Sequence, residues 1–190
     1  MKKMQVILAS LLMGVTAGCG SEEKFEPNVW AEREMCVIKV EDTEADICYG
    51  MEREEAEQAT GAVAEEDKPT GTMYADGLRV FYREGKVAAI DLTEPSRGVY
   101  RTARGAQVGM TRTELIDLYG DAYMKETGPG HLDYYYDIDA KKLLQDPQKD
   151  LAMGSEEDLQ NTHLISIQLD GDEKAEFISV MDRRRAVRMD

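Results

Sequence analysis

Apolar and polar residues alternate between residues 78 and 92 in the pattern of a β-hairpin with one buried face. Every second residue of the first half is apolar, and these residues are Leu78, Val80 and Tyr82. A Glu84-Gly85 pair follows and leads into the apolar run 87–92. A period of two places side chains on one face of a strand, and a glycine-containing pair is typical of a tight turn. The pattern therefore predicts two antiparallel strands in this stretch.

A second set of strands is predicted near the end of the chain. The alternation returns between residues 132 and 137, where the apolar-face residues are Leu132, Tyr134 and Tyr136. A polar stretch at 140–162 separates this strand from two apolar runs, 163–169 and 175–181. The acidic, glycine-containing segment 170–174 between those runs is typical of a turn, so the two runs are predicted to pair.

Two glycine-bounded stretches of the chain resemble each other. They read GMEREEAEQATG at residues 50–61 and GMTRTELIDLYG at residues 109–120, an offset of 59 residues without a gap. In the second copy, Thr111 followed by Glu114 is the capping-box pattern of a helix start, and Gly120 is a typical helix stop. The first copy has smaller apolar residues, which predicts a shorter and less buried helix.

The first residues have the layout of a secretory signal. A basic start at Lys2 and Lys3 precedes the apolar run 6–15, which is too short to span a bilayer. The next four residues, 16–19, read Thr-Ala-Gly-Cys. This stretch resembles the lipobox of bacterial lipoproteins, although that pattern usually has leucine at the position of the threonine. The resemblance implies cleavage before Cys19.

Cys19 would then carry a diacylglyceryl group, as the same resemblance implies, and hold the chain on the extracytoplasmic face of the cell membrane. Ordinary secretion with cleavage after Ala17 is the alternative, because small residues there also suit the general signal peptidase. The polar segment 20–24 has no periodic apolar residue and can act as a tether, which favours the lipid anchor.

The expected fold class is α+β, built as two tandem repeats of a helix followed by an antiparallel sheet. Neither repeat alone offers much core, so the two sheets are expected to join or to pack as one body. The predicted organisation is a signal peptide at 1–18, a tether at 19–28, a first repeat at 29–97 and a second repeat at 98–190.

Cys36 and Cys48 remain once Cys19 is assigned to lipid. They lie in two predicted strands, 35–40 and 45–49, and a hairpin between these strands would place the two cysteines opposite each other. Outside the cytoplasm such a pair can form a disulfide. Two reduced, buried cysteines acting as small hydrophobic residues are the alternative, and the sequence favours neither.

Composition and charge limit the class of partner. The chain is 42% hydrophobic and 32% charged, as in a soluble globular protein, and its formal net charge is −15. Nucleic acid is not an expected partner, because binding it requires a positive surface. A strongly negative surface mainly favours solubility and names no ligand by itself.

Few residues offer catalytic or metal chemistry. The chain has two histidines, His131 and His163, with no further ligand at the spacing of a zinc site. The acidic segment 170–173 is shorter than the twelve-residue loop of an EF-hand, and a turn is the preferred interpretation. The arginine-rich stretch 183–188 is interpreted as a solvated terminus rather than a lipid contact. We expect no catalytic residue, no metal and no cofactor.

Three segments together resemble a known family, and they read GAQVGMTRTELIDLYG, LDYYYDI and HLISIQL. They are similar to lipoproteins of Gram-positive bacteria with a beta-lactamase-inhibitor-protein-like fold, and to SmpA/OmlA-type outer-membrane assembly lipoproteins. The likeness covers roughly residues 35–181. It implies a tandem helix-plus-sheet fold and protein binding rather than catalysis. It does not imply inhibition of a beta-lactamase, because such folds host unrelated roles.

The strand alternation leaves Phe81 and Tyr135 facing away from the predicted core. Each aromatic residue lies between two charges of one sign, and these residues are Arg79 and Arg83 in the first repeat and Asp133 and Asp137 in the second. Aromatic side chains ringed by polar groups are typical of protein interfaces. We therefore expect an extracytoplasmic protein or peptide to bind there. The alternative is that both aromatics lie under another segment as a satellite core.

A non-enzymatic binding module is thus the leading functional hypothesis. A structural or assembly-type envelope protein is the second hypothesis. A hydrolase that uses a carboxylate cleft is the third, because paired carboxylates can perform acid and base catalysis.

Overall fold

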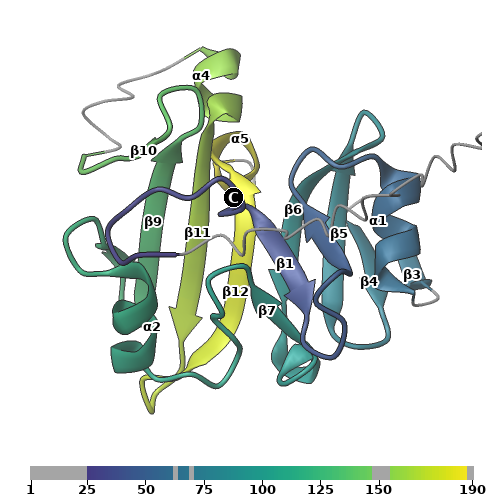
Figure 1. The fold of residues 1–190 in the computed structure, drawn as a ribbon, viewed down its shortest axis with the longest axis horizontal. Coiled ribbons are helices and arrows are strands. Elements are labelled where there is room, and N and C mark those ends of the chain that lie inside the picture. The colour runs from purple at the N-terminus through teal and green to yellow at the C-terminus, as the bar shows by residue number, and fades with distance from the viewer. Residues whose placement is uncertain (1–24, 62–63, 69–70, 147–154, 188–190) are drawn as a thin grey trace, which may run out of the picture.

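The computed structural model describes residues 25–61, 64–68, 71–146 and 155–187, and these form an α+β fold, as predicted (Figure 1). The strands are β1 (Cys36–Lys39), β2 (Asp46–Cys48), β3 (Ala64–Lys68), β4 (Gly71–Tyr74), β5 (Leu78–Arg83), β6 (Lys86–Leu92), β7 (Tyr100–Thr102), β8 (Lys125–Gly128), β9 (His131–Asp137), β10 (Lys142–Leu143), β11 (Thr162–Leu169) and β12 (Ala175–Asp182). The helices are α1 (Arg53–Thr60), α2 (Arg112–Tyr119), α4 (Glu156–Asn161) and α5 (Arg183–Ala186), with a 3-10 turn η1 (Glu94–Ser96).

One antiparallel sheet runs through the molecule in the order β10-β9-β11-β12-β6-β5-β4-β3, and β8 also pairs with β9. Both predicted hairpins are present, as β5–β6 and β11–β12. They meet because β6 pairs with β12, from Ala89 opposite Met181 to Leu92 opposite Ile178. Strands from 29–97 and from 98–190 therefore belong to one sheet.

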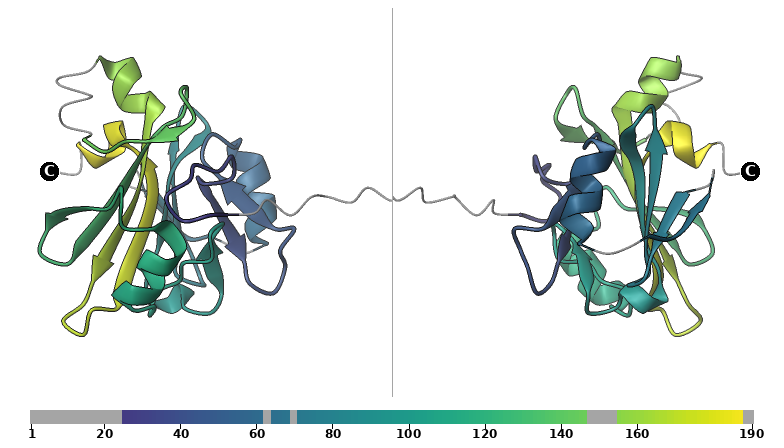
Figure 2. Two further views of the ribbon diagram at one scale, coloured as in Figure 1. Left: turned by 60° about the vertical axis from the view of Figure 1, so that its left-hand side comes forward. Right: turned by 90° about the vertical axis from the view of Figure 1, so that its right-hand side faces the viewer.

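A second, three-stranded sheet has the order β2-β1-β7. Strand β7 follows residue 97 in the chain, yet it pairs with β1, with Val37 opposite Thr102. This small sheet therefore also joins the two predicted regions. Figure 2 shows the small sheet and α1 on one side of the main sheet and α5 on the other. We refer to these two sides as the core face and the back face.

The segment before each of the helices α1 and α2 docks on a hairpin through the same three backbone hydrogen bonds. At α1 these run from Gly50 N–H to Val87 O (2.8 Å), from Arg53 N–H to Gly85 O (2.8 Å) and from Val87 N–H to Met51 O (2.9 Å). At α2 they run from Gly109 N–H to Ala175 O (2.7 Å), from Arg112 N–H to Glu173 O (2.9 Å) and from Ala175 N–H to Met110 O (2.8 Å). The hairpin that corresponds to β5–β6 is therefore β11–β12. Strand β9, which carries the second alternation, does not occupy the place of β5.

The main core lies between the main sheet and the layer formed by α1, α2 and the small sheet. The residues predicted to face inward are buried there, except for a half-buried Tyr82, and these residues are Leu78, Val80, Leu132, Tyr134 and Tyr136. The ring of Tyr119 on α2 stacks on Tyr134, with 4.8 Å between centroids. The Tyr134 hydroxyl donates to the Gly120 carbonyl at 3.0 Å, so its buried polar end is satisfied.

A buried arginine fixes the N-terminal segment to this core. Arg104 donates to both carboxylate oxygens of Glu34, at 2.6 and 2.9 Å, and both side chains are almost fully buried. Its remaining hydrogen bonds go to three backbone carbonyls, those of Glu26, Val29 and Leu118. A buried ion pair is tolerated when all its donors are satisfied, and Arg104 meets this condition. Residues 25–34 are thereby attached to the body of the fold.

Candidate binding groove

The structure corrects the predicted exposure of Phe81. This residue does lie on the back face of the main sheet, but only 7% of it is exposed. Helix α5 covers it, with the Arg185 guanidinium 3.9 Å from its ring centroid and Ala186 packed against the same apolar cluster. The other buried members of that cluster are Ala89, Leu164 and Met181. Phe81 is thus part of a satellite core, because α5, far away in the sequence, packs on the back face.

The two arginines predicted to flank Phe81 are also engaged within the fold. Arg79 Nε lies 3.1 Å from the Oδ2 atom of Asp91, and burial raises the pKa of this carboxyl. Arg83 donates to Asp182, which is fully buried. Neither arginine forms the free positive rim that the sequence predicts.

The two predicted acids of β9 have structural partners as well. Asp133 is buried and accepts three hydroxyl hydrogen bonds, from Thr127 (2.6 Å), Ser166 (2.6 Å) and Tyr135 (3.3 Å). Asp137 accepts from the backbone N–H of Ala140 at 2.9 Å. A free negative rim is therefore not present either, and Asp133 instead holds the hydroxyl of Tyr135.

Tyr135 differs from Phe81 because it lines a groove. The cavity measures about 460 Å³, and its other lining residues are Lys125, Glu126, Thr127, Gln145, Asp146 and Arg183. These residues come from β8, the segment after β10, and α5, while Tyr135 comes from the centre of β9. We refer to this set of seven residues as the Tyr135 groove. Its volume is in the range of known ligand sites.

The groove combines one aromatic side chain with charges of both signs. Burial and the neighbouring Asp133 raise the pKa of Tyr135 to about 12, so its hydroxyl is protonated at neutral pH. Lys125 and Arg183 supply positive charge, and Glu126 and Asp146 supply negative charge. Among the described residues, the lining thus offers one phenolic ring and four charged side chains for contact with a partner.

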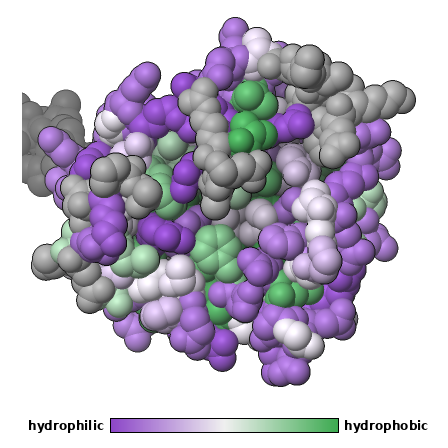
Figure 3. Space-filling model, turned by 180° about the vertical axis from the view of Figure 1, so that it is seen from behind, coloured by the Kyte–Doolittle hydropathy of each residue, from purple (hydrophilic) through white to green (hydrophobic). Residues whose placement is uncertain are grey.

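The back face as a whole is mainly polar. Figure 3 shows a largely hydrophilic surface with hydrophobic patches that are separated from one another. Within the described ranges, the exposed large hydrophobic residues are Val29, Val40 and Val187. A partner on this face would therefore meet polar groups and a few apolar side chains rather than a broad apolar patch.

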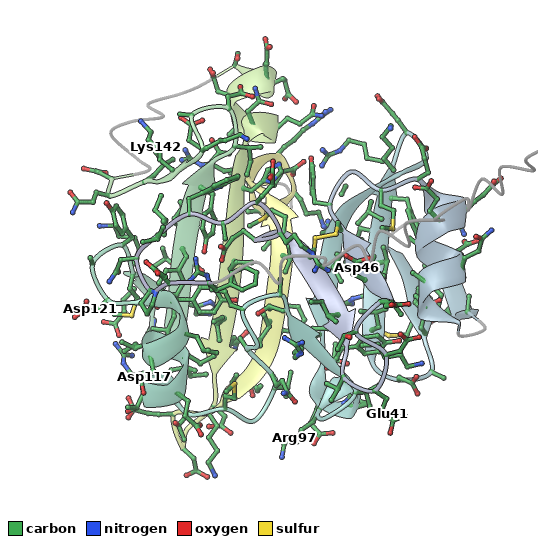
Figure 4. The ribbon with its side chains drawn as sticks, in the orientation of Figure 1. Glu41, Asp46, Arg97, Asp117, Asp121 and Lys142 are labelled. Atoms are coloured by element: carbon green, nitrogen blue, oxygen red, sulfur yellow. A yellow bond between two sulfur atoms is a disulfide. The ribbon has the colours of Figure 1, made fainter. Side chains whose placement is uncertain are left out.

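Cys36 and Cys48 form a disulfide, with their sulfur atoms 2.04 Å apart and the two residues opposite each other in β1 and β2. Asp46, labelled in Figure 4, is the first residue of β2, and it accepts a hydrogen bond from Arg33 at 2.6 Å. Asp46 and the two sulfurs are the one cluster of three potential metal ligands found in the described part of the chain. Because the sulfurs are joined, this cluster does not offer thiolate ligands.

The acidic segment at 170–174 forms the predicted turn. The carboxylate of Asp170 accepts the N–H groups of Asp172 and Lys174 at 2.9 Å each, and these bonds lower its pKa. The arginine-rich stretch differs from the prediction, because its first residues form α5 on the back face, where Arg184 lies 2.8 Å from Glu156. Its last residue, Arg188, lies outside the described residues.

The predicted lipid-bearing residue, Cys19, also lies outside the described residues, together with the signal segment 1–18. No helix in the described ranges is both long enough and apolar enough to cross a membrane. No family model, curated protein or solved structure matches the chain. The resemblance to envelope lipoproteins therefore stays a prediction from the residues.

Sequence patterns identified Tyr135 but missed the residues around it. Lys125 and Glu126 lie in the short strand β8, and Gln145 and Asp146 follow β10. No motif distinguishes them from other polar positions of the sequence. Arg183 was part of the arginine-rich stretch, but nothing in its sequence indicates which face of the sheet it reaches. Only the packing of α5 brings it to the groove.

Proposed function

We propose that the chain is a membrane-anchored extracytoplasmic lipoprotein that binds a protein or peptide without catalysing a reaction, and that the Tyr135 groove is its binding site. The observation that carries this proposal is a cavity of about 460 Å³ with one aromatic wall and charges of both signs. Aromatic and arginine side chains in partly desolvated hollows concentrate binding energy at protein interfaces. Tyr135 is already oriented by Asp133, so a partner would not have to order it.

The anchor at Cys19 is part of the same proposal. Its support is the Thr-Ala-Gly-Cys pattern at 16–19 and the Cys36–Cys48 disulfide, because disulfides persist mainly in oxidising compartments. The Cys19→Ala protein is expected to leave the membrane fraction, while a Cys36→Ala, Cys48→Ala double variant is expected to stay in it. Retention of the Cys19→Ala protein in the membrane contradicts the anchor.

We also propose that the chain contains two tandem repeats of a helix and an antiparallel sheet. The support is the shared set of three backbone hydrogen bonds before α1 and α2 and the 59-residue offset between the two stretches. The two hairpins that receive those bonds lie on either side of the β6–β12 junction. A duplicated unit explains why the same local contacts recur at two places in one sheet.

Site-specific photocrosslinking in intact cells tests the groove. A photoreactive residue at position 135 is expected to capture a discrete partner, and the same probe at Asp117, an exposed position on α2, is not (Figure 4). Lys125→Glu in the groove is expected to reduce capture. Arg97→Glu, the matched charge reversal at an exposed position away from the groove, is expected to leave capture unchanged.

Equal capture from positions 135 and 117 contradicts the proposal, and so does capture that Lys125→Glu leaves unchanged. A structural envelope role is the second candidate, supported by the largely hydrophilic back face (Figure 3). In that case, cells that lack the chain are expected to have a weakened envelope. Expression of the Tyr135→Ala variant in those cells is expected to restore the envelope fully.

A further inference from the structure

A second, smaller cavity lies on the core face of the main sheet. It measures about 200 Å³, and its lining residues are Trp30, Ala31, Glu32, Glu34, Met35, Tyr49, Ile138, Lys141 and His163. We refer to it as the Trp30 pocket. His163 on β11 alternates with Leu164, which belongs to the back-face cluster, so the two residues point to opposite sides of the sheet. This Trp30 pocket shares no residue with the Tyr135 groove.

Two buried polar atoms of the pocket residues have no hydrogen-bond partner. They are Nε1 of Trp30 and Nδ1 of His163. Leaving a buried polar atom unpaired is costly, and such atoms in folded proteins call for a specific explanation. Both atoms belong to residues that line the same cavity.

The two atoms need opposite kinds of partner. Trp30 Nε1 is always a donor. Burial lowers the pKa of His163 to about 4, so its ring is neutral at pH 7. In the neutral tautomer that carries its proton on Nε2, the unpaired Nδ1 offers a lone pair. Nδ1 is therefore an acceptor. An occupant must offer one hydrogen-bond donor and one acceptor.

The remaining walls favour an uncharged aromatic ring. The ring centroids of Tyr49 and His163 lie 4.0 Å apart, and Met35 and Ile138 add apolar surface. The charged residues of the lining pair within the fold, Lys141 with Glu32 at 3.4 Å and Glu34 with Arg104 at 2.6 Å. An engineered apolar cavity of roughly 150 Å³ is sufficient to bind benzene. The Trp30 pocket can therefore hold a single ring with a small substituent.

We propose that the Trp30 pocket binds a neutral aromatic alcohol of the phenol type. The ring lies among the apolar walls, and the hydroxyl donates to His163 Nδ1 and accepts from Trp30 Nε1–H. One hydroxyl has both capacities, which an apolar ring lacks. A water molecule can also pair with both atoms, but it leaves the apolar walls unfilled. Phenol itself is therefore the probe, and water alone is the competing occupant.

The chain contains one tryptophan, so its fluorescence and its single indole N–H resonance both report on this pocket. Titration of the full chain with phenol is expected to give a saturable change in both signals. Toluene, which has the ring without the hydroxyl, is expected to bind at least tenfold more weakly. The absence of a saturable change, as expected for water alone, overturns the proposal. So does equal affinity for phenol and toluene.

The two histidines provide a matched pair of variants. His163→Phe removes the acceptor and is expected to weaken phenol binding about tenfold, the loss of one hydrogen bond. His131→Phe, on the back face of β9, is expected to leave phenol binding unchanged, and so is Tyr135→Ala in the groove. Unchanged affinity in His163→Phe overturns the proposal. If His163→Phe does not fold, the comparison of phenol with toluene on the unmodified chain decides.

Discussion

Helices α1 and α2 begin from the same backbone contacts, but they bury different side chains. In α1 the buried positions are Ala56 and Thr60, and 59 residues later α2 buries Leu115 and Tyr119. All four are at most 1% exposed. The recurring hydrogen bonds thus determine where each helix docks, while the volume of the buried residues determines how much apolar surface the docking removes from water.

The two helices also differ at their first residue. Thr111 and Glu114 form a capping box at α2, in which each side chain bonds the backbone N–H of the other. At α1 the corresponding residue is Glu52, whose side chain makes no cap hydrogen bond. Because an uncapped N-terminus leaves backbone donors unpaired, α1 is expected to be the weaker helix. Five substitutions or conditions test this difference, and their expected effects decrease in order.

The largest effect is expected from Leu115→Ala. This change removes a fully buried side chain from the main core and leaves a cavity, so the free energy of unfolding is expected to fall by about 3 kcal/mol. Urea denaturation measures it. Leu118→Ala, at a half-buried position of the same helix, is the control and is expected to cost less. A loss below about 1 kcal/mol for Leu115→Ala would show that α2 is not firmly docked.

The reverse change at the matching position is expected to have a somewhat smaller effect. Ala56→Leu adds volume to a fully buried site of α1, so overpacking is expected to reduce the free energy of unfolding by about 2 kcal/mol. Ala59→Leu, at a half-buried position one turn later, is the control. A stabilised Ala56→Leu protein would mean that α1 lies further from the sheet than the structure indicates.

Removal of the α2 cap is expected to lower the free energy of unfolding by less than either of these core substitutions. Thr111→Ala deletes the hydroxyl that accepts from the Glu114 N–H, and the expected loss is about 1 kcal/mol. Thr113→Ala, two residues later and exposed, is the control and is expected to change little. Equal stability of the two variants would contradict a role for the cap.

Adding a side-chain cap to α1 is expected to raise the free energy of unfolding slightly. Glu52 has extended backbone angles similar to those of Thr111, and Glu55 already stands three residues later. Glu52→Thr completes a capping-box pattern and is expected to add about 0.5 kcal/mol. The exposed ion pair between Glu52 and Lys86 is lost, but such pairs contribute little. Glu54→Thr, which offers no cap, should not stabilise the chain.

The smallest effect is expected from pH. Hydrogen bonds from Thr111 lower the pKa of Glu114 in the folded state. Because the pKa is lower in the folded state, the ionised carboxylate contributes its full stabilisation of the fold above the unfolded-state pKa of about 4.3. It is lost as the pH falls through the folded pKa. The stability difference between the unmodified chain and Glu114→Gln is therefore expected at pH 7 and expected to vanish in acid. A constant difference across that range would exclude the carboxylate as its source.

Local patterns predicted several elements of this fold, but no pattern predicted β3, β4, β7, β8 or α5. The alternation at residues 78–92, the capping box at Thr111 and the turn at 170–174 each depend on neighbours in the sequence, and all three are present. Strand pairing over long distances could not be obtained in the same way. The β1–β7 pair of the small sheet and the β6–β12 pair of the main sheet join segments with no marker of each other, so both sheets emerge only from the packing.

In the candidate site, too, the local sequence predicts some features and not others. Alternation correctly placed Phe81 on the face opposite the core, but it carries no information about what covers that face. The Arg185 contact with Phe81 and the Arg183 contribution to the Tyr135 groove both depend on the packing of α5, a four-residue helix. The two unpaired atoms of the Trp30 pocket have no sequence signal either, since only their surroundings make them unpaired.

Arg104 also has a mechanical consequence. If Cys19 is the anchor, a pull between the membrane and the protein enters the fold through residues 25–34. The guanidinium of Arg104 binds this segment at Glu26, Val29 and Glu34. Asn28 shares this load, because its N–H donates to the Tyr119 carbonyl at 2.8 Å and its Oδ1 accepts from the Ala122 N–H at 2.9 Å. Glu34 also accepts from the Tyr136 hydroxyl of β9 at 3.0 Å, so tension reaches α2 and the main sheet together. Arg104 is thus one of several points at which such a load enters the fold.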